Sequence, residues 1–148
     1  MSELSISLEW NLQEKELKPD IFSKNHKIII NDSVFNAGSA PEYGGKENEI
    51  NPEQSLAASI SSCHMMTFLA LAAKMRWPVL SYKDKASAFL GKNSKGKMSV
   101  TNIELNPKVK FSNNFSVDIQ KMKEVQERAH RYCFIANSLA EEVVVKIN

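Results

Sequence analysis

A long apolar segment, interrupted only by small polar residues, extends over residues 51–77 and dominates the hydrophobic pattern of the chain. Its opening, Asn51-Pro52-Glu53, is typical of a helix start, with a capping Asn, Pro in the first turn and a carboxylate near the positive end of the helix dipole. Trp77-Pro78 stops the pattern, so we expect the helix to run to about Arg76. One face carries residues spaced by three or four positions: Leu56, Ile60, Cys63, Thr67 and Leu71. Alanines make the other faces apolar too, which predicts burial on more than one side, against a second helix or a second subunit.

Shorter segments have the alternating pattern of strands. We expect strands over residues 4–12, 27–30 and 34–35, and further along the chain over 79–91, 97–105, 107–111 and 143–147. Residues 36–50, rich in Gly, Pro and charge, predict a long loop. A second helix is expected over about 119–131, after a capping segment at 113–118, with an inner face of Met122, Val125, Gln126 and Ala129. This order predicts an α+β fold in which a long central helix packs on antiparallel sheets, and the length of 148 residues predicts a single domain over 1–148.

Composition narrows the possible partners and the location. The formal net charge is only +2, which argues against nucleic acid and membrane partners. The first twenty residues have neither a basic segment nor an apolar one, so no secretory signal is predicted. We therefore expect a cytoplasmic protein, where two cysteines are reduced thiols or a transient redox pair rather than a permanent crosslink.

The chain has two cysteines, Cys63 in the long helix and Cys133 just after the second helix. A cysteine on an apolar helix face is most often small hydrophobic filler. Polar neighbours change that interpretation for Cys63, because Glu53 opens the same helix and His64 is adjacent. Cys133 follows a basic segment and precedes a short helical stretch, where free backbone N–H groups lower the pKa of a thiol. Together the two contexts favour a redox pair.

Other chemistries fit these residues less well. Cys63 and His64 diverge by about 100° on a helix, so they are poor ligands for one metal ion, and the pair His130 and Cys133 lacks a partner motif. A cysteine hydrolase with His130 as base has no local signature. With only five glycines, the chain shows no phosphate loop or dinucleotide fingerprint. No metal and no cofactor is expected.

Two segments resemble a known family. NPEQSLAASISSCHMMTFLALAAKM resembles the first-cysteine helix of the OsmC/Ohr superfamily of cysteine-based hydroperoxide reductases, with its NPE opening and a cysteine ten residues after the Glu. AHRYCFIANSL is similar to the second-cysteine segment, and W…FSKNHKIII and EEVVV fit the OsmC-like branch. The resemblance covers nearly the whole chain. It implies an intertwined homodimer, with long helices between sheets from both subunits and two active sites at the subunit interface.

The resemblance also implies residue roles. Cys63 would be the peroxidatic cysteine, Cys133 the resolving cysteine, and Glu53 the carboxylate that orients the active-site cation. The family's arginine is matched by Lys24, which supplies charge without the two-pronged hydrogen bonding of a guanidinium. Arg128 or Arg131 is the alternative cation. His64 is a further candidate, interpreted as a structural or supporting residue rather than a base.

The function expected from this resemblance is a thiol peroxidase. The Cys63 thiolate would reduce an organic hydroperoxide, and hydrogen peroxide as a second substrate, to give a sulfenic acid. Cys133 would then form a disulfide with Cys63, which an external dithiol reduces, a dihydrolipoyl protein being the family's suggestion. The alternative is a catalytically weak or degenerate OsmC-like stress-response protein with a binding or structural role, which Lys24 in place of arginine favours.

Overall fold

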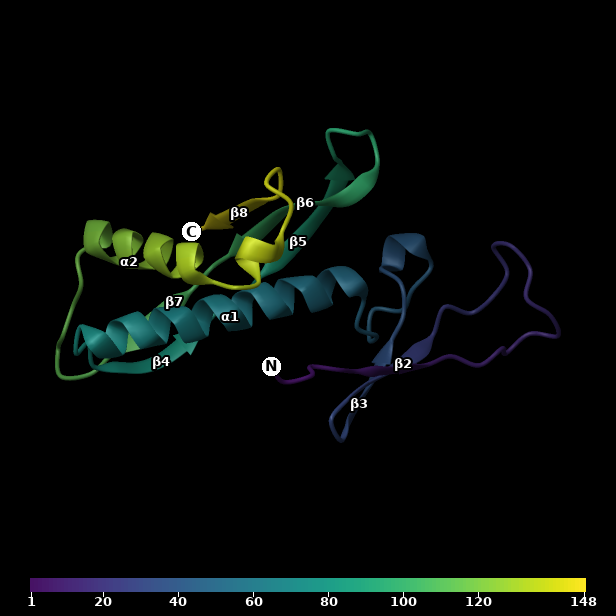
Figure 1. Ribbon diagram of the computed structural model, residues 1–148, viewed down its shortest axis with the longest axis horizontal. Helices are drawn as coiled ribbons and strands as arrows, with labels where there is room; N and C mark the ends of the chain where they lie inside the picture. Colours follow the sequence, from purple (N-terminus) through teal and green to yellow (C-terminus); the bar gives the residue numbers. More distant parts are fainter. The chain divides into compact units, whose positions relative to one another are not determined.

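The computed structural model describes all residues 1–148 and divides the chain into two compact units, Met1–Ser55 and Leu56–Asn148 (Figure 1). We call them the N-terminal and the C-terminal unit. The boundary falls inside the long helix α1 (Pro52–Lys74), whose first turn belongs to the N-terminal unit.

The N-terminal unit is built on an antiparallel sheet in the order β1-β2-β3, comprising β1 (Ser7–Glu9), β2 (His26–Ile30) and β3 (Ser33–Ala37). The tight turn between β2 and β3 places Asn31 in the left-handed region, with φ 53°, which asparagine tolerates better than most residues. The strands predicted at 27–30 and 34–35 are confirmed, and they pair as the antiparallel hairpin β2–β3. The prediction of a strand over 4–12 is wrong in length, because only three residues pair with β2. The predicted loop contains a short 3₁₀ helix, η1 (Pro41–Tyr43).

Helix α1 starts and stops as its sequence predicts. At the start, the side chain of Asn51 accepts a hydrogen bond from the Gln54 N–H at 2.8 Å, and the side chain of Gln54 accepts one from the Asn51 N–H at 3.1 Å. This reciprocal capping box satisfies two N–H groups that the helix itself leaves free. At the end, Arg76 adopts a left-handed φ of 57° and its N–H donates to the Ala73 carbonyl, while the Trp77 N–H donates to the Ala72 carbonyl. These bonds form a Schellman motif, which closes the helix.

The C-terminal unit has two sheets and two helices. The antiparallel pair β4 (Val79–Lys83) and β7 (Lys108–Phe111) forms one sheet. The other has the order β5-β6-β8, with β5 (Ser87–Lys92), β6 (Met98–Leu105) and β8 (Val144–Ile147). Helix α2 (Ile119–Tyr132) begins at Asp118, whose side chain accepts from the Lys121 N–H at 2.8 Å, and a 3₁₀ turn, η2 (Ala136–Ser138), precedes β8.

Two sequence predictions for this unit are corrected. Residues 79–91 form two strands in different sheets, not one, because Asp84 between them accepts hydrogen bonds from Ser61 at 2.5 Å and from the Asn106 N–H at 2.6 Å. This anchoring fixes the chain where it changes sheet. The sheets are also not wholly antiparallel, since β8 pairs with β6 in parallel.

The core of the C-terminal unit forms along α1, which Figure 1 shows running beside both sheets and α2. One cluster joins α1 to α2 and the β4–β7 sheet through Phe68, Leu71, Ala72, Val125 and Ala129. The other joins α1 to the β5-β6-β8 sheet through Ile60, Ile103 and Leu105. The helix is long and apolar enough to cross a membrane by length and composition alone. Its packing against both sheets is that of a core helix.

The buried face of α1 differs in part from the predicted one. Its fully buried residues are Ala57, Ile60, His64, Phe68, Leu71 and Ala72. The predicted members Leu56, Cys63 and Thr67 lie at the edge of this face and are half-buried. The shift of one position exchanges the environments of Cys63 and His64, so the thiol reaches the surface of the core while the imidazole is enclosed in it.

Candidate functional site

Cys63 lies at the start of the fourth turn of α1 and is half-buried. Because every backbone N–H around it is used in the helix, the thiol depends on side chains and on other segments for hydrogen bonds. The Thr67 hydroxyl, one turn further on, donates to the Cys63 carbonyl at 2.9 Å. This contact holds Thr67 against the cysteine on the same edge of the helix.

Cys133 ends α2 and is fully buried. The helix stops there because the backbone of Cys133 turns to an extended conformation, while its N–H still donates to the His130 carbonyl at 3.2 Å. The chain then folds back into η2, which brings the Ala136 N–H to 3.4 Å from the Cys133 sulfur. The helix end and the following turn therefore fix this thiol from both sides.

The two thiols lie within hydrogen-bonding reach of each other, and their acidities diverge. Burial and, after it, the neighbouring Cys63 raise the pKa of the Cys133 thiol to about 11, against the lowering effect of the Ala136 N–H. Burial also raises the pKa of Cys63, but the Cys133 thiol, the backbone N–H groups of Ile135 and Phe134 and the Thr67 hydroxyl outweigh it. The net pKa of Cys63 is below its ordinary value. One sulfur is thus the better anion and the other keeps its proton, which it can donate.

His64 points away from this pair into the core, where it is 1% exposed. Its Nε2–H donates to the side-chain oxygen of Gln126 on α2 at 2.6 Å, and its Nδ1 is buried without a partner. Burial lowers the pKa of His64, offset in part by Gln126, while His130 lowers it and Asp84 raises it. The ring is therefore held neutral, so it is not a cation for the Cys63 thiolate. The helix periodicity predicted that Gln126 is buried, but it did not predict the hydrogen bond between Gln126 and His64.

The candidate cations on α2 lie at the surface. Arg128 and Arg131 are exposed and border a shallow cavity of about 290 Å³ together with Glu124 and Glu127. Neither is among the groups that act on the pKa of Cys63. The groups that lower the pKa of Cys63 are neutral donors, and two of them are backbone N–H groups after Cys133, which residue types do not reveal.

The two remaining candidates belong to the N-terminal unit. The Lys24 ammonium donates to the Tyr43 carbonyl at 3.4 Å, and Glu53 occupies the first turn of α1 with a buried Oε2 that has no hydrogen-bond partner. Ten residues of α-helix advance about 15 Å, so Glu53 does not contact the Cys63 sulfur of the same helix. The roles of Lys24 and Glu53 stay predictions. No group of three or more His, Cys, Asp or Glu side chains is arranged to hold a metal ion.

These features define a class of protein: an α+β chain in which a long helix presents one cysteine to a second cysteine at the end of the next helix. The family model for OsmC-like proteins matches residues 44–148, and the chain belongs to this family. The resemblance drawn from the two cysteine segments is thereby confirmed, and the α+β fold with it.

Solved structures agree with this assignment. An OsmC-like protein of unknown function from Vibrio cholerae is 40% identical over 100% of both chains, with a TM-score of 0.88. Two structures below 25% identity show the same fold. OhrB, the organic hydroperoxide resistance protein of Bacillus subtilis, is 19% identical over 97% of this chain and 95% of its own, with a TM-score of 0.68. OsmC, an organic hydroperoxide resistance protein from Legionella pneumophila, is 15% identical over 99% and 97%, with a TM-score of 0.72. No curated protein sequence matches the chain.

Proposed function

We propose that the chain is a thiol peroxidase that reduces organic hydroperoxides. The observation that carries the proposal is the pairing of Cys63 with Cys133, in which one thiol has a lowered pKa and the other a raised one. A peroxidatic cysteine reacts as a thiolate, whereas a resolving cysteine remains protonated until a sulfenic acid forms beside it. The names of the Bacillus subtilis and Legionella pneumophila proteins support a hydroperoxide as substrate.

The proposed reaction has three steps. The Cys63 thiolate attacks the O–O bond of the hydroperoxide, which gives a Cys63 sulfenic acid and an alcohol once the leaving oxygen takes up a proton. The Cys133 thiol then attacks the sulfenic sulfur, forming a disulfide and releasing water. An external dithiol, such as a dihydrolipoyl group on a partner protein, reduces that disulfide by two exchange steps and is itself oxidised to a disulfide.

We propose a preference for organic hydroperoxides, which the lining of a cavity in the N-terminal unit supports. An apolar cavity of about 750 Å³ there is walled by Leu8, Trp10, Leu17 and Phe22, with Lys24 also lining it. If Lys24 acts at the site, as its match to the family's arginine predicts, an apolar wall accompanies it. Such a wall favours an alkyl hydroperoxide over hydrogen peroxide.

We further propose that the working form is a homodimer in the cytoplasm. The face of α1 opposite the core is exposed along Ala58, Ser62, Met66 and Ala70, which gives small and apolar side chains for another helix to pack on. Because Glu53 and Cys63 lie about 15 Å apart along one helix, we propose that the helix of a second copy brings Glu53 to the site. Sedimentation should show a dimer at micromolar concentration, and Met66→Glu should weaken it, whereas a monomeric wild type would contradict this arrangement.

The peroxidase proposal is tested with purified protein, cumene hydroperoxide and dihydrolipoamide. We expect dithiol-dependent peroxide consumption that Cys63→Ser abolishes. In Cys133→Ser the first turnover should remain, leaving a Cys63 sulfenic acid that dimedone traps. Equal rates for wild type and Cys63→Ser would refute the proposal.

A second candidate function is a catalytically weak OsmC-like protein with a binding or structural role. It is favoured by the absence of any positive charge among the groups that lower the pKa of Cys63. Alkylation of Cys63 followed against pH separates the two candidates. A midpoint at or above the ordinary thiol value of about 8.5 favours the second candidate, and a lower one favours the peroxidase.

A further inference from the structure

Helices α1 and α2 pack on each other through apolar side chains, with one exception. The apolar side chains are those of Phe68, Leu71, Ala72, Val125 and Ala129. The exception is the hydrogen bond from His64 Nε2–H to Gln126 Oε1, at 2.6 Å, which is the one side-chain hydrogen bond between the two helices. His64 is 1% exposed and Gln126 is 5% exposed. Because little water is available as a substitute partner, this hydrogen bond is costly to break.

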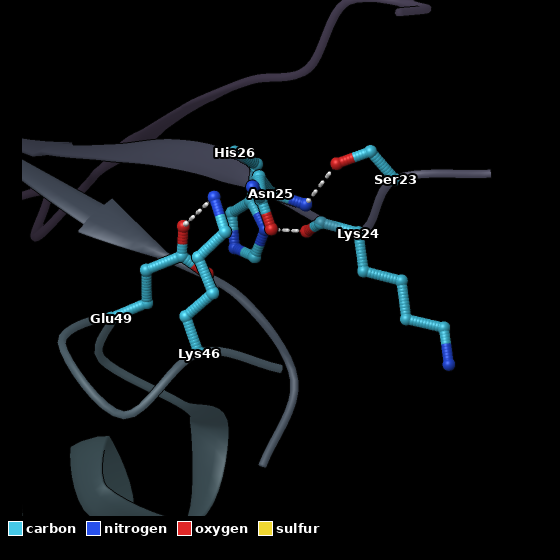
Figure 2. A network of polar contacts seen from close by, with 6 residues as sticks. All are labelled: Ser23, Lys24, Asn25, His26, Lys46 and Glu49. Atoms are coloured by element: carbon cyan, nitrogen blue, oxygen red, sulfur yellow. Dashed lines mark hydrogen bonds and ion pairs between the residues drawn. The ribbon is translucent and has the colours of Figure 1, made fainter. Parts of the chain in front are cut away.

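The polar contacts of the N-terminal unit are of a different kind (Figure 2). Lys46 is 63% exposed there, and its ammonium lies 3.8 Å from Glu49 Oε1. An ion pair with one partner so exposed is weakened by water and salt and constrains the backbone little. Between two buried side chains, solvent does not relax the directional requirement of a hydrogen bond. The contact between His64 and Gln126 therefore constrains the helices that carry it.

This hydrogen bond and the cysteine pair join the same two helices. His64 directly follows Cys63 on α1. On α2, Gln126 precedes Cys133 by seven residues, which is about two helical turns, so both lie on the same side of the helix. Cys63 and Cys133 are themselves within hydrogen-bonding reach of each other. The two helices are thus connected at two points that lie about 10 Å apart along α2.

Apolar packing alone determines the register of two helices less strictly than a hydrogen bond does. Dispersion contacts tolerate a small slide, whereas an N–H···O bond weakens steeply as its distance and angle change. A slide of α2 along α1 by about 1 Å would break the bond between His64 and Gln126 and would displace Cys133 from Cys63. A disulfide also depends on the separation of its two cysteines, and a strained one is reduced more easily.

We propose that the hydrogen bond between His64 and Gln126 is a positioning contact, which sets α2 on α1 in the register that brings Cys133 to Cys63. Neither residue reacts, since the His64 ring points away from the thiols into the core. The inference rests on the proposed function, because it gives the two residues a part in forming the disulfide of the peroxidase cycle. That disulfide is also measured without peroxide, so the two proposals are tested separately.

Equilibration of the full-length protein with oxidised and reduced dithiothreitol tests the proposal. In this exchange Cys63 and Cys133 give two electrons and two protons to the oxidised reagent, which becomes the dithiol. The test variant combines His64→Leu with Gln126→Met, which replaces both polar groups by apolar ones of similar size. Its stability in urea unfolding should therefore stay near that of the wild type. We expect its disulfide equilibrium constant to fall by about tenfold or more, because the register is no longer fixed.

Three single variants serve as controls. His64→Gln keeps an N–H donor for Gln126 and should keep the wild-type constant. Val125→Ala weakens the same helix interface without removing the hydrogen bond, and its constant should stay within about twofold of the wild type. Gln126→Asn withdraws the acceptor by one methylene group. It replaces the double variant if that protein does not fold, and its constant should also fall.

A lower constant at wild-type stability in the double variant, with His64→Gln unaffected, supports the proposal. An unchanged constant in the double variant or in Gln126→Asn would overturn it. So would an equal fall in Val125→Ala, which would show that the constant follows the stability of the interface rather than its register. A wild type that forms no disulfide between Cys63 and Cys133 overturns it too. If that disulfide forms but the wild type consumes no peroxide, only the proposed function is refuted.

Discussion

Acidification should destabilise the folded chain through His64. This imidazole is fully buried, its Nε2–H is bonded to Gln126, and its Nδ1 faces no partner. Burial lowers its pKa, with His130 acting in the same direction and Gln126 and Asp84 opposing. When the pH falls below the unfolded pKa, the unfolded chain takes up a proton that the folded chain does not. Stability contributed by neutral His64 is therefore complete above that pKa and is lost as the pH falls toward the folded value.

The magnitude follows from proton linkage. With an unfolded pKa of about 6.5, the free energy of unfolding falls by at most about 1.4 kcal/mol between about pH 8 and pH 5.5. This upper limit applies when the folded pKa lies well below that range. For a chain of this length, such a loss lowers the midpoint of thermal unfolding by about 3–6 °C.

Urea unfolding, followed at several pH values in wild type and His64→Gln, measures the effect. Glutamine keeps an N–H that can donate to Gln126 but does not titrate in this range. The variant should therefore lack the His64 part of the acid slope, whatever its stability at pH 8. Met65→Leu, a volume-conserving change at the next position, is the control and should keep the wild-type slope. Identical slopes for wild type and His64→Gln would refute the reasoning.

Three further predictions concern single side chains. Cys133→Ala should raise the pKa of Cys63, because the thiol hydrogen bond that stabilises the thiolate is lost; iodoacetamide alkylation against pH measures this, and an unmoved or lower midpoint would contradict it. Phe68→Ala should cost about 3–5 kcal/mol in urea unfolding, since Phe68 is 0% exposed and its ring lies 5.6 Å from that of Tyr82; a loss below about 1 kcal/mol would place it outside the core. Tyr82→Phe should be neutral or stabilising, because the buried hydroxyl has no partner; a loss above about 1 kcal/mol would show that it has one.

The sequence determined the local elements wherever the controlling interactions are close along the chain. The capping box of Asn51 and Gln54, the stop before Trp77-Pro78 and the Asp118 cap are contacts within one or two turns, so residue order alone predicted both helices to within a few residues. The two cysteine segments could also be recognised from the sequence, because each motif is a short run of neighbouring residues. They identified the family without knowledge of the fold.

Only the tertiary structure decided the contacts between distant segments. The break of residues 79–91 into two strands depends on Asp84 bonding to Ser61 and to the Asn106 N–H, partners more than twenty residues away. A helix apolar on most faces has no strong periodicity, which is why the sequence put Cys63 rather than His64 on the buried face.

The divergence of the two thiol acidities has the same origin. It depends on burial and on backbone N–H groups after Cys133. Because almost every residue type has a backbone N–H, the sequence does not show which of these groups will face a thiol. The sequence indicated that the two cysteines form a pair, whereas burial and the backbone N–H groups of Phe134 and Ile135 decided which of them is the better thiolate.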